Sequence, residues 1–241
     1  MSTIRIRQTT AALLILGATL VNIPYTLLIM NFDYPDILRA PTAQILSRFQ
    51  AGGDALIYTW LTFAWVGLPL LLGVIMLKRV LEPESSHFLA TATTLGVVGS
   101  FVQVIGFLRW VFVVPVLARL FTDPMTDSAT KASISTVFVA VHQYGGVVLG
   151  EHLGQFLTIL WMSMISGILY KSQMFSKWVA WLGWFASAVY LLAQTELFST
   201  AIPDFPEIGW AGFYGSLLWL VWMIVLGVYL VKYKNALHGN I

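Results

Sequence analysis

The stretch AALLILGATLVNIPYTLLIM, residues 11–30, decides the fold class of this 241-residue chain. It matches the length of about 20 apolar residues that a helix needs to cross a lipid bilayer, and only Asn22 and Pro24 interrupt it. The stretch is long for the apolar region of a signal peptide, and residues 31–35 contain no small-x-small cleavage site. We therefore expect it to remain in the protein as a membrane-spanning helix.

Apolar stretches of this kind recur along the whole chain. Hydrophobic residues make up 58% of the sequence and charged residues only 10%, whereas roughly a quarter of the residues of a soluble domain are charged. The predicted spans are residues 11–30, 56–77, 88–112, 147–170, 178–197 and 210–231. The sequence thus predicts an all-α polytopic membrane protein in which residues 1–241 form a single integral membrane domain, a six-transmembrane-helix bundle.

Composition excludes several classes of function. The chain contains no cysteine, which excludes disulfides, thiolate nucleophiles, Cys-ligated zinc and iron–sulfur clusters. Its net charge is +2 and it has no long run of Lys or Arg, so no nucleic-acid partner is expected. Membrane lipids are the expected partners, and the sequence identifies no cofactor.

Positive charge divides unevenly between the two sides of the predicted membrane domain. One side carries Arg5, Arg7, Lys78, Arg79, Lys171, Lys177, Lys232 and Lys234, and the other carries Arg39, Arg48, Arg119 and Lys131. Lys and Arg favour the cytoplasmic side of a membrane protein. We therefore expect both termini in the cytoplasm.

The two long loops predicted on the outer side each contain a helical pattern. Residues 35–49 place apolar side chains at helical spacing, with Arg39 and Arg48 available for lipid headgroups, and residues 128–142 follow Asp127, a suitable N-cap. Both segments are predicted to be interfacial amphipathic helices that cover the outer mouth of the bundle. Gly52 and Gly53 would let the chain turn from the first of them into the second span.

Two ionic residues lie inside predicted spans, where a charge needs a partner or a function. Arg109 is near the outer end of the third span and Glu151 is near the outer end of the fourth. Gln103 shares a helix face with Arg109, and Gln155 shares one with Glu151. Glycines recur every four residues from 146 to 154, so the backbones of the two helices are expected to approach closely.

Three readings of these residues remain open. In the first, an outer-leaflet site around Arg109 and Glu151 binds a lipid-like or small polar or anionic ligand, for sensing or for passage across the membrane. Its candidate ligand-binding residues are Arg109, Glu151, His152, Gln155, Gln103 and His142. In the second, a metal-dependent intramembrane enzyme uses His142, Glu151 and His152, which requires a helix break at residues 144–146. In the third, Arg109 and Glu151 only lock two helices together in a structural or assembly subunit.

Four short blocks resemble a known family. They are YPDIL at residues 34–38, RFQAGG at residues 48–53, LRWVFVVP at residues 108–115 and GEHLG at residues 150–154. Together they are similar to an uncharacterised bacterial multipass membrane family, the domain-of-unknown-function family numbered 4386, and the likeness runs over most of the chain. The resemblance implies a bacterial inner (plasma) membrane location and implies no particular chemistry.

Overall fold

The computed structural model describes residues 3–84 and 86–238, and all regular structure in this part of the chain is helical. Five helical stretches are long and apolar enough to cross a membrane. They are Thr3–Phe32, Thr42–Glu84, Leu89–Thr122, Ser128–Lys171 and Trp210–Lys232. The prediction of an all-helical multipass membrane protein is confirmed at this level.

The remaining predicted span, residues 178–197, falls on two shorter helices. Helix α9 covers Lys177–Leu192 and helix α10 covers Gln194–Ser199, with Ala193 between them. Helix α9 has 16 residues, fewer than the roughly 20 that cross the hydrocarbon region without distortion. This segment is therefore not among the five candidate spans.

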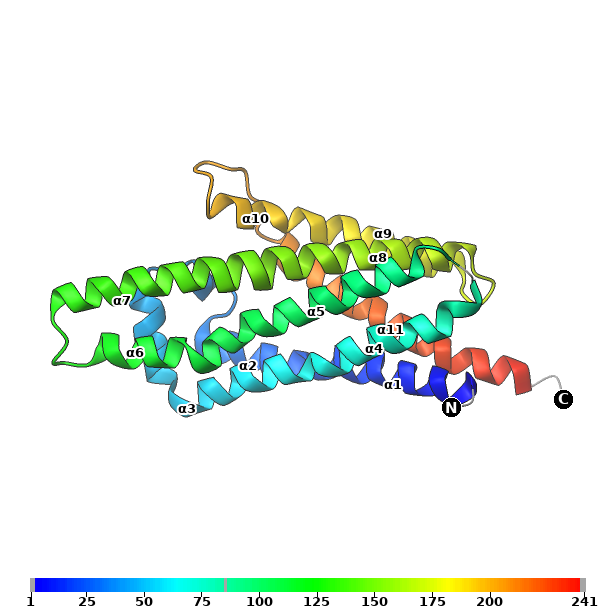
Figure 1. Ribbon diagram of the computed structural model, residues 1–241, viewed down its shortest axis with the longest axis horizontal. Coiled ribbons are helices and arrows are strands. Elements are labelled where there is room, and N and C mark those ends of the chain that lie inside the picture. The colour runs from blue at the N-terminus through cyan, green and yellow to red at the C-terminus, as the bar shows by residue number, and fades with distance from the viewer. Residues whose placement is uncertain (1–2, 85, 239–241) are drawn as a thin grey trace. The chain divides into compact units, whose positions relative to one another are not determined.

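Contacts within the chain divide it into two compact units. That the two units form a single integral membrane domain stays a prediction. Unit 1 comprises residues 1–19, 68–101 and 152–241. Its helices are α1 (Thr3–Leu20), α4 (Leu68–Leu81), η2 (Glu82–Glu84), the first half of α5 (Leu89–Phe112), α8 (Gly154–Lys171), α9, α10 and α11 (Ala211–His238). Helix α9 packs against both α8 and α11, and Figure 1 shows it running beside α8. Large buried side chains such as Trp161 and Trp222 fill the core of this unit.

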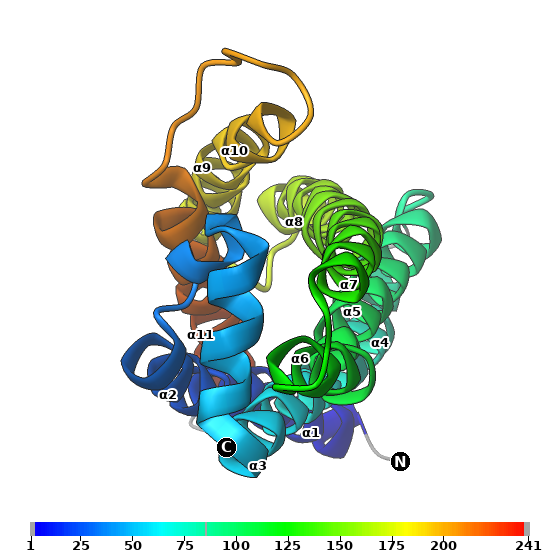
Figure 2. The ribbon, with the colours of Figure 1, turned by 90° about the vertical axis from the view of Figure 1, so that its left-hand side faces the viewer.

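Unit 2 comprises residues 20–67 and 102–151. Its helices are α2 (Asn22–Phe32), η1 (Asp36–Arg39), α3 (Thr42–Val66), the second half of α5, α6 (Val114–Thr122), α7 (Ser128–Val141) and most of η3 (His142–Leu153). Helix α3 packs against α2 and α6. Helices α6 and α7 are joined by a short loop and lie side by side, as Figures 1 and 2 show.

The two helical segments predicted in the long loops are present with different boundaries. Residues 36–39 form the single turn η1, and α3 then begins at Thr42 and continues past Phe49. The apolar side chains predicted to share one face of residues 35–49 are all buried in the core of unit 2: Ile37, Leu38, Ile45, Leu46 and Phe49. The core buries this stripe because folding removes its apolar surface from water.

Asp127 caps α7 as predicted. Its side chain accepts a hydrogen bond from the Thr130 backbone N–H at 2.7 Å, and this bond holds the pKa of Asp127 below its usual value. Helix α7 ends at Val141, but the chain stays helical and runs directly through η3 into α8. The helix break at residues 144–146 that the metal-enzyme alternative requires is therefore absent, and a π-helix occupies residues 142–153 instead.

The chain turns at Gly53, as the sequence indicates. Gly53 has φ 56° and ψ −155° inside α3, a conformation that only glycine adopts readily, and it divides α3 by a kink. The cations of this segment form ion pairs with acidic side chains of the protein. Arg48 pairs with Asp33 at 2.6 Å and Arg39 pairs with Glu151 at 2.6 Å.

Candidate functional site

An aromatic stack in unit 2 forms one wall of the candidate site. The Trp110 ring, on α5, stacks on Trp60 of α3 with centroids 5.0 Å apart and planes at 9°. The Phe49 ring packs on the same indole, with centroids 5.6 Å apart and planes at 28°. All three side chains are at most 2% exposed, so the residue that precedes Trp110 is anchored on a rigid base.

Arg109 extends from this base into the interior of unit 2. The residue is 8% exposed, and its guanidinium carbon lies 5.1 Å from the centroid of the Trp110 ring. Its Nη1 donates a hydrogen bond to the Gly106 carbonyl at 2.5 Å, and its Nη2 lies so close to Gly146 that a Cβ atom there would clash with it. The Nε atom of Arg109 is buried and has no hydrogen-bond partner.

Glycines allow the close approach that places this arginine. A Cβ atom added to Gly106 would lie 2.6 Å from the Gly150 Cα, nearer than real Cβ atoms come to neighbouring atoms. The backbones of α5 and η3 are therefore in direct contact, as the glycine spacing predicts. Arg109 on α5 reaches Gly146 on η3 as a result of this contact.

The Glu151 carboxylate interacts with two arginines. Its Oε2 accepts a hydrogen bond from the Arg39 Nη2 at 2.6 Å, and its negative charge also attracts Arg109, which makes no ion pair with it. The Oε1 atom of Glu151 is buried without a partner. These three charges sum to +1, two positive and one negative.

His142, at the start of η3, closes the cluster. Its Nε2 lies 3.1 Å from the Leu38 carbonyl, and its ring stacks on Phe138 with centroids 5.2 Å apart. A carbonyl only accepts hydrogen bonds, so Nε2 carries the proton and the Nδ1 of the neutral ring is an acceptor. That Nδ1 is buried and has no partner.

Five buried polar atoms of this cluster and of the aromatic stack beside it therefore lack a partner. Three are donors, on Arg109, Trp110 and Trp60, and two are acceptors, on Glu151 and His142. Buried polar groups are normally satisfied, and each exception calls for an explanation such as a bound water or ligand. A net positive charge with an excess of donors suits a small anion that also carries a hydroxyl group.

The other predicted site residues are Gln103, His152 and Gln155. Gln103 is half-buried on α5, about two turns before Arg109. His152 and Gln155 belong to unit 1, where Gln194 joins them: His152 Nδ1 lies 2.6 Å from Gln194 Oε1, and Gln194 Nε2 donates to Gln155 Oε1 at 2.9 Å. Arg109, Glu151 and His142 are thus the predicted residues that unit 2 brings together.

The residues required by the metal-enzyme reading do not converge. Among the described residues, no group of three His, Asp or Glu side chains is placed to hold a metal ion. His142 and His152 remain on one unbroken helix and make their hydrogen bonds to different groups. The required convergence of His142, Glu151 and His152 is therefore not present.

Sequence reasoning missed Arg39 as a partner of Glu151. The two residues are separated by 112 positions in the chain, and Arg39 lies outside the predicted spans, where a cation is ordinary. Tyr34 also acts electrostatically on Arg109. Tyr34 lies in the block YPDIL and Arg39 directly follows it. That block was therefore the sequence signal that could have pointed to both residues.

Unit 2 thus holds a buried charged cluster within an all-helical multipass membrane protein. Residues 9–227 match the family described as a domain of unknown function (DUF4386), and the chain belongs to this family. No curated protein and no solved structure matches the chain.

Proposed function

We propose that this membrane protein binds a small anionic or lipid-like ligand at the cluster of Arg109, Glu151, Arg39 and His142, for sensing or for passage across the membrane. The observation that carries the proposal is the set of five partnerless buried polar atoms around a net charge of +1. A buried, incompletely satisfied arginine is costly unless a ligand completes its hydrogen bonds.

The proposal includes an arrangement in the membrane. The helices α9 and α10 together form a sixth crossing, and both termini lie in the cytoplasm of a bacterial inner membrane. The segments at residues 35–49 and 128–142 lie at the outer interface, which places the cluster in the outer half of the bundle. The Lys and Arg distribution and the amphipathic pattern of both segments support this arrangement.

The experiment titrates purified protein with dihexanoylphosphatidic acid and, in a second arm, with inorganic phosphate. Replacing Arg109 by Gln removes charge-assisted hydrogen bonds, so affinity for the phosphatidic acid should fall by about tenfold or more. Glu151→Gln should have the opposite effect, because it removes the carboxylate that competes with the anion for both arginines. Dihexanoylglycerol, which lacks the phosphate, should not bind at the cluster.

Arg48→Gln is the matched control, since it also removes one positive charge from unit 2 but outside the cluster. Binding of inorganic phosphate with equal affinity would identify a free anion as the ligand and not a lipid. If Arg109→Gln, Glu151→Gln and Arg48→Gln all bind the phosphatidic acid as the native protein does, the cluster is structural and the proposal is wrong.

A further inference from the structure

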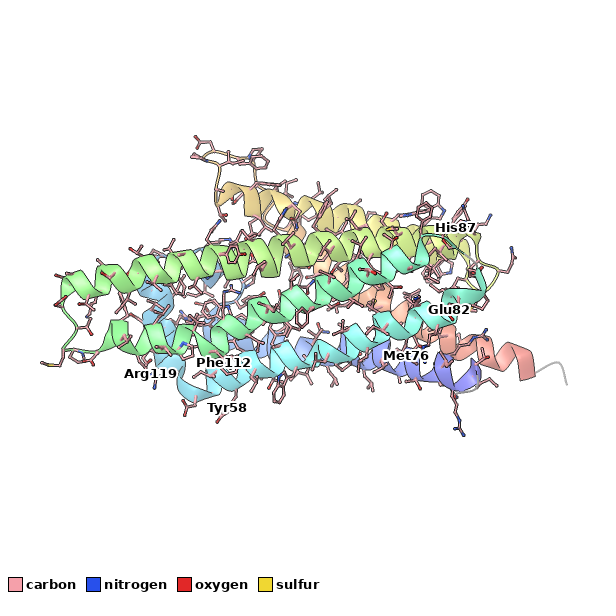
Figure 3. All side chains as sticks on the ribbon, viewed as in Figure 1. Tyr58, Met76, Glu82, His87, Phe112 and Arg119 are labelled. Carbon is pink, nitrogen blue, oxygen red and sulfur yellow. The ribbon has the colours of Figure 1, made fainter. Side chains whose placement is uncertain are left out.

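A hollow of about 280 Å³ opens on unit 2 between α3 on one side and α5 and α6 on the other. It is a different place from the Arg109 cluster, because none of Arg109, Glu151, Arg39 and His142 lines it. Its polar lining includes Asp54 and Gln50 from α3 and Arg119 from α6. Figure 3 shows Arg119 and Phe112 at the surface of this part of unit 2.

The hollow lies at the kink of α3, and Gly53 is one of its lining residues. Phe49 and Gln50 line it from the part of α3 before the kink, and Asp54 and Ile57 line it from the part after. A Cβ atom added to Gly53 would meet nothing within 4 Å, so this glycine is required by its backbone angles and not by crowding. In membrane proteins an interrupted helix is tolerated where it is packed in protein or lines a cavity.

Two opposite charges face this hollow without pairing. Asp54 and Arg119 are both exposed, and within the described residues neither side chain makes an ion pair or a side-chain hydrogen bond. Other acid–base pairs of unit 2 do close, at 2.6 Å. A cation and an anion that stay apart across one hollow can be bridged by a ligand that carries both charges.

The apolar surface beside the hollow identifies the source of such a ligand. Phe112 is 68% exposed and Val116 is 45% exposed, and both line the hollow. They belong to the candidate span Leu89–Thr122, so acyl chains are the expected covering of this surface. A free zwitterion would leave these side chains uncovered.

We infer that the hollow binds a zwitterionic phospholipid headgroup, with its phosphate at Arg119 and a primary ammonium at Asp54. A primary ammonium donates hydrogen bonds to a carboxylate, whereas the quaternary ammonium of a choline headgroup has no N–H to donate. The site therefore distinguishes ethanolamine from choline headgroups through Asp54, and it recognises phosphate through Arg119.

The test compares phosphatidylethanolamine, phosphatidylcholine and phosphatidylglycerol with identical chains, by native mass spectrometry of the full-length protein in detergent. The native protein should retain the ethanolamine lipid in preference to the other two. Arg119→Gln should weaken retention of all three lipids by about fivefold. Asp54→Asn should remove the preference for ethanolamine over choline and leave the phosphate contact intact.

Matched controls separate this site from the Arg109 cluster. Arg48→Gln removes a partly exposed charge of the same unit outside the hollow and should keep the native preference, and Arg109→Gln should keep it too. Loss of the preference in Arg109→Gln, or equal retention of the three lipids by the native protein, would overturn the inference. So would displacement of the bound lipid by glycerophosphoethanolamine at equal concentration, which would show that acyl chains contribute nothing.

Discussion

At the scale of single residues, Gly146 is the position on which the Arg109 cluster depends. A Cβ atom at residue 146 would clash with the Arg109 Nη2, and Arg109 is also held by its contacts with Gly106 and Trp110. Gly146→Ala should therefore displace the guanidinium and lower the free energy of unfolding by about 1–3 kcal/mol, the usual cost of overpacking. Thermal unfolding in detergent measures the effect.

The neighbouring glycine provides the control for that substitution. A Cβ atom at Gly145 would lie 3.7 Å from the Arg109 Cδ, an ordinary contact. Gly145→Ala should thus leave both the melting temperature and the phosphatidic acid affinity near their native values. Equal losses in the two alanine variants would show that Gly146 is not specifically required by Arg109.

At the scale of elements, the kink in α3 is the feature whose contribution to the free energy of unfolding is easiest to test. Gly53 adopts angles that are essentially restricted to glycine, so Gly53→Ala should destabilise the protein by about 1–3 kcal/mol. It should also weaken retention of phosphatidylethanolamine, because Phe49, Gln50 and Asp54 take their places in the hollow from this kink.

Gly67, at the end of α3, provides the control substitution for Gly53→Ala. Its φ is −72° and ψ is −22°, and an added Cβ atom would lie no nearer than 3.4 Å to any neighbour. Gly67→Ala should be nearly neutral in thermal unfolding and in lipid retention. If Gly53→Ala were equally neutral, the backbone angles of Gly53 would not be needed for the fold.

Sequence reasoning predicted well those elements that a local sequence pattern indicates. It predicted contacts between distant segments less well. Hydropathy located the five candidate spans, Asp127 identified the start of α7, and the glycine spacing predicted the approach of α5 to η3. The Arg39 to Glu151 pair joins positions 112 residues apart, so no local pattern indicates it. The π-helix at residues 142–153 was also missed, because glycines at 145 and 146 suit a break as well as a wide helical turn.

At the scale of the whole molecule, the predicted membrane topology can be tested by labelling two engineered cysteines. Because the chain has no cysteine, engineered thiols have no background. With the termini in the cytoplasm, Met125→Cys should react with a membrane-impermeant maleimide added outside intact cells, and Lys171→Cys should react only after the membrane is opened. Both positions are exposed in the folded chain. If only Lys171→Cys were labelled in intact cells, the termini would lie outside the cell and the predicted orientation would be wrong.

The stack of Trp60 on Trp110 gives unit 2 an optical property. Two indoles 5.0 Å apart with planes at 9° couple their electronic transitions, and the cation of Arg109 lies 5.1 Å from one of them. An anion that arrives at Arg109 changes the electric field across the Trp110 ring and hence its absorption and emission. The difference in near-ultraviolet circular dichroism between the native protein and Trp110→Phe therefore isolates this pair from the other tryptophans. Occupancy of the cluster becomes visible as a spectral shift without any attached dye.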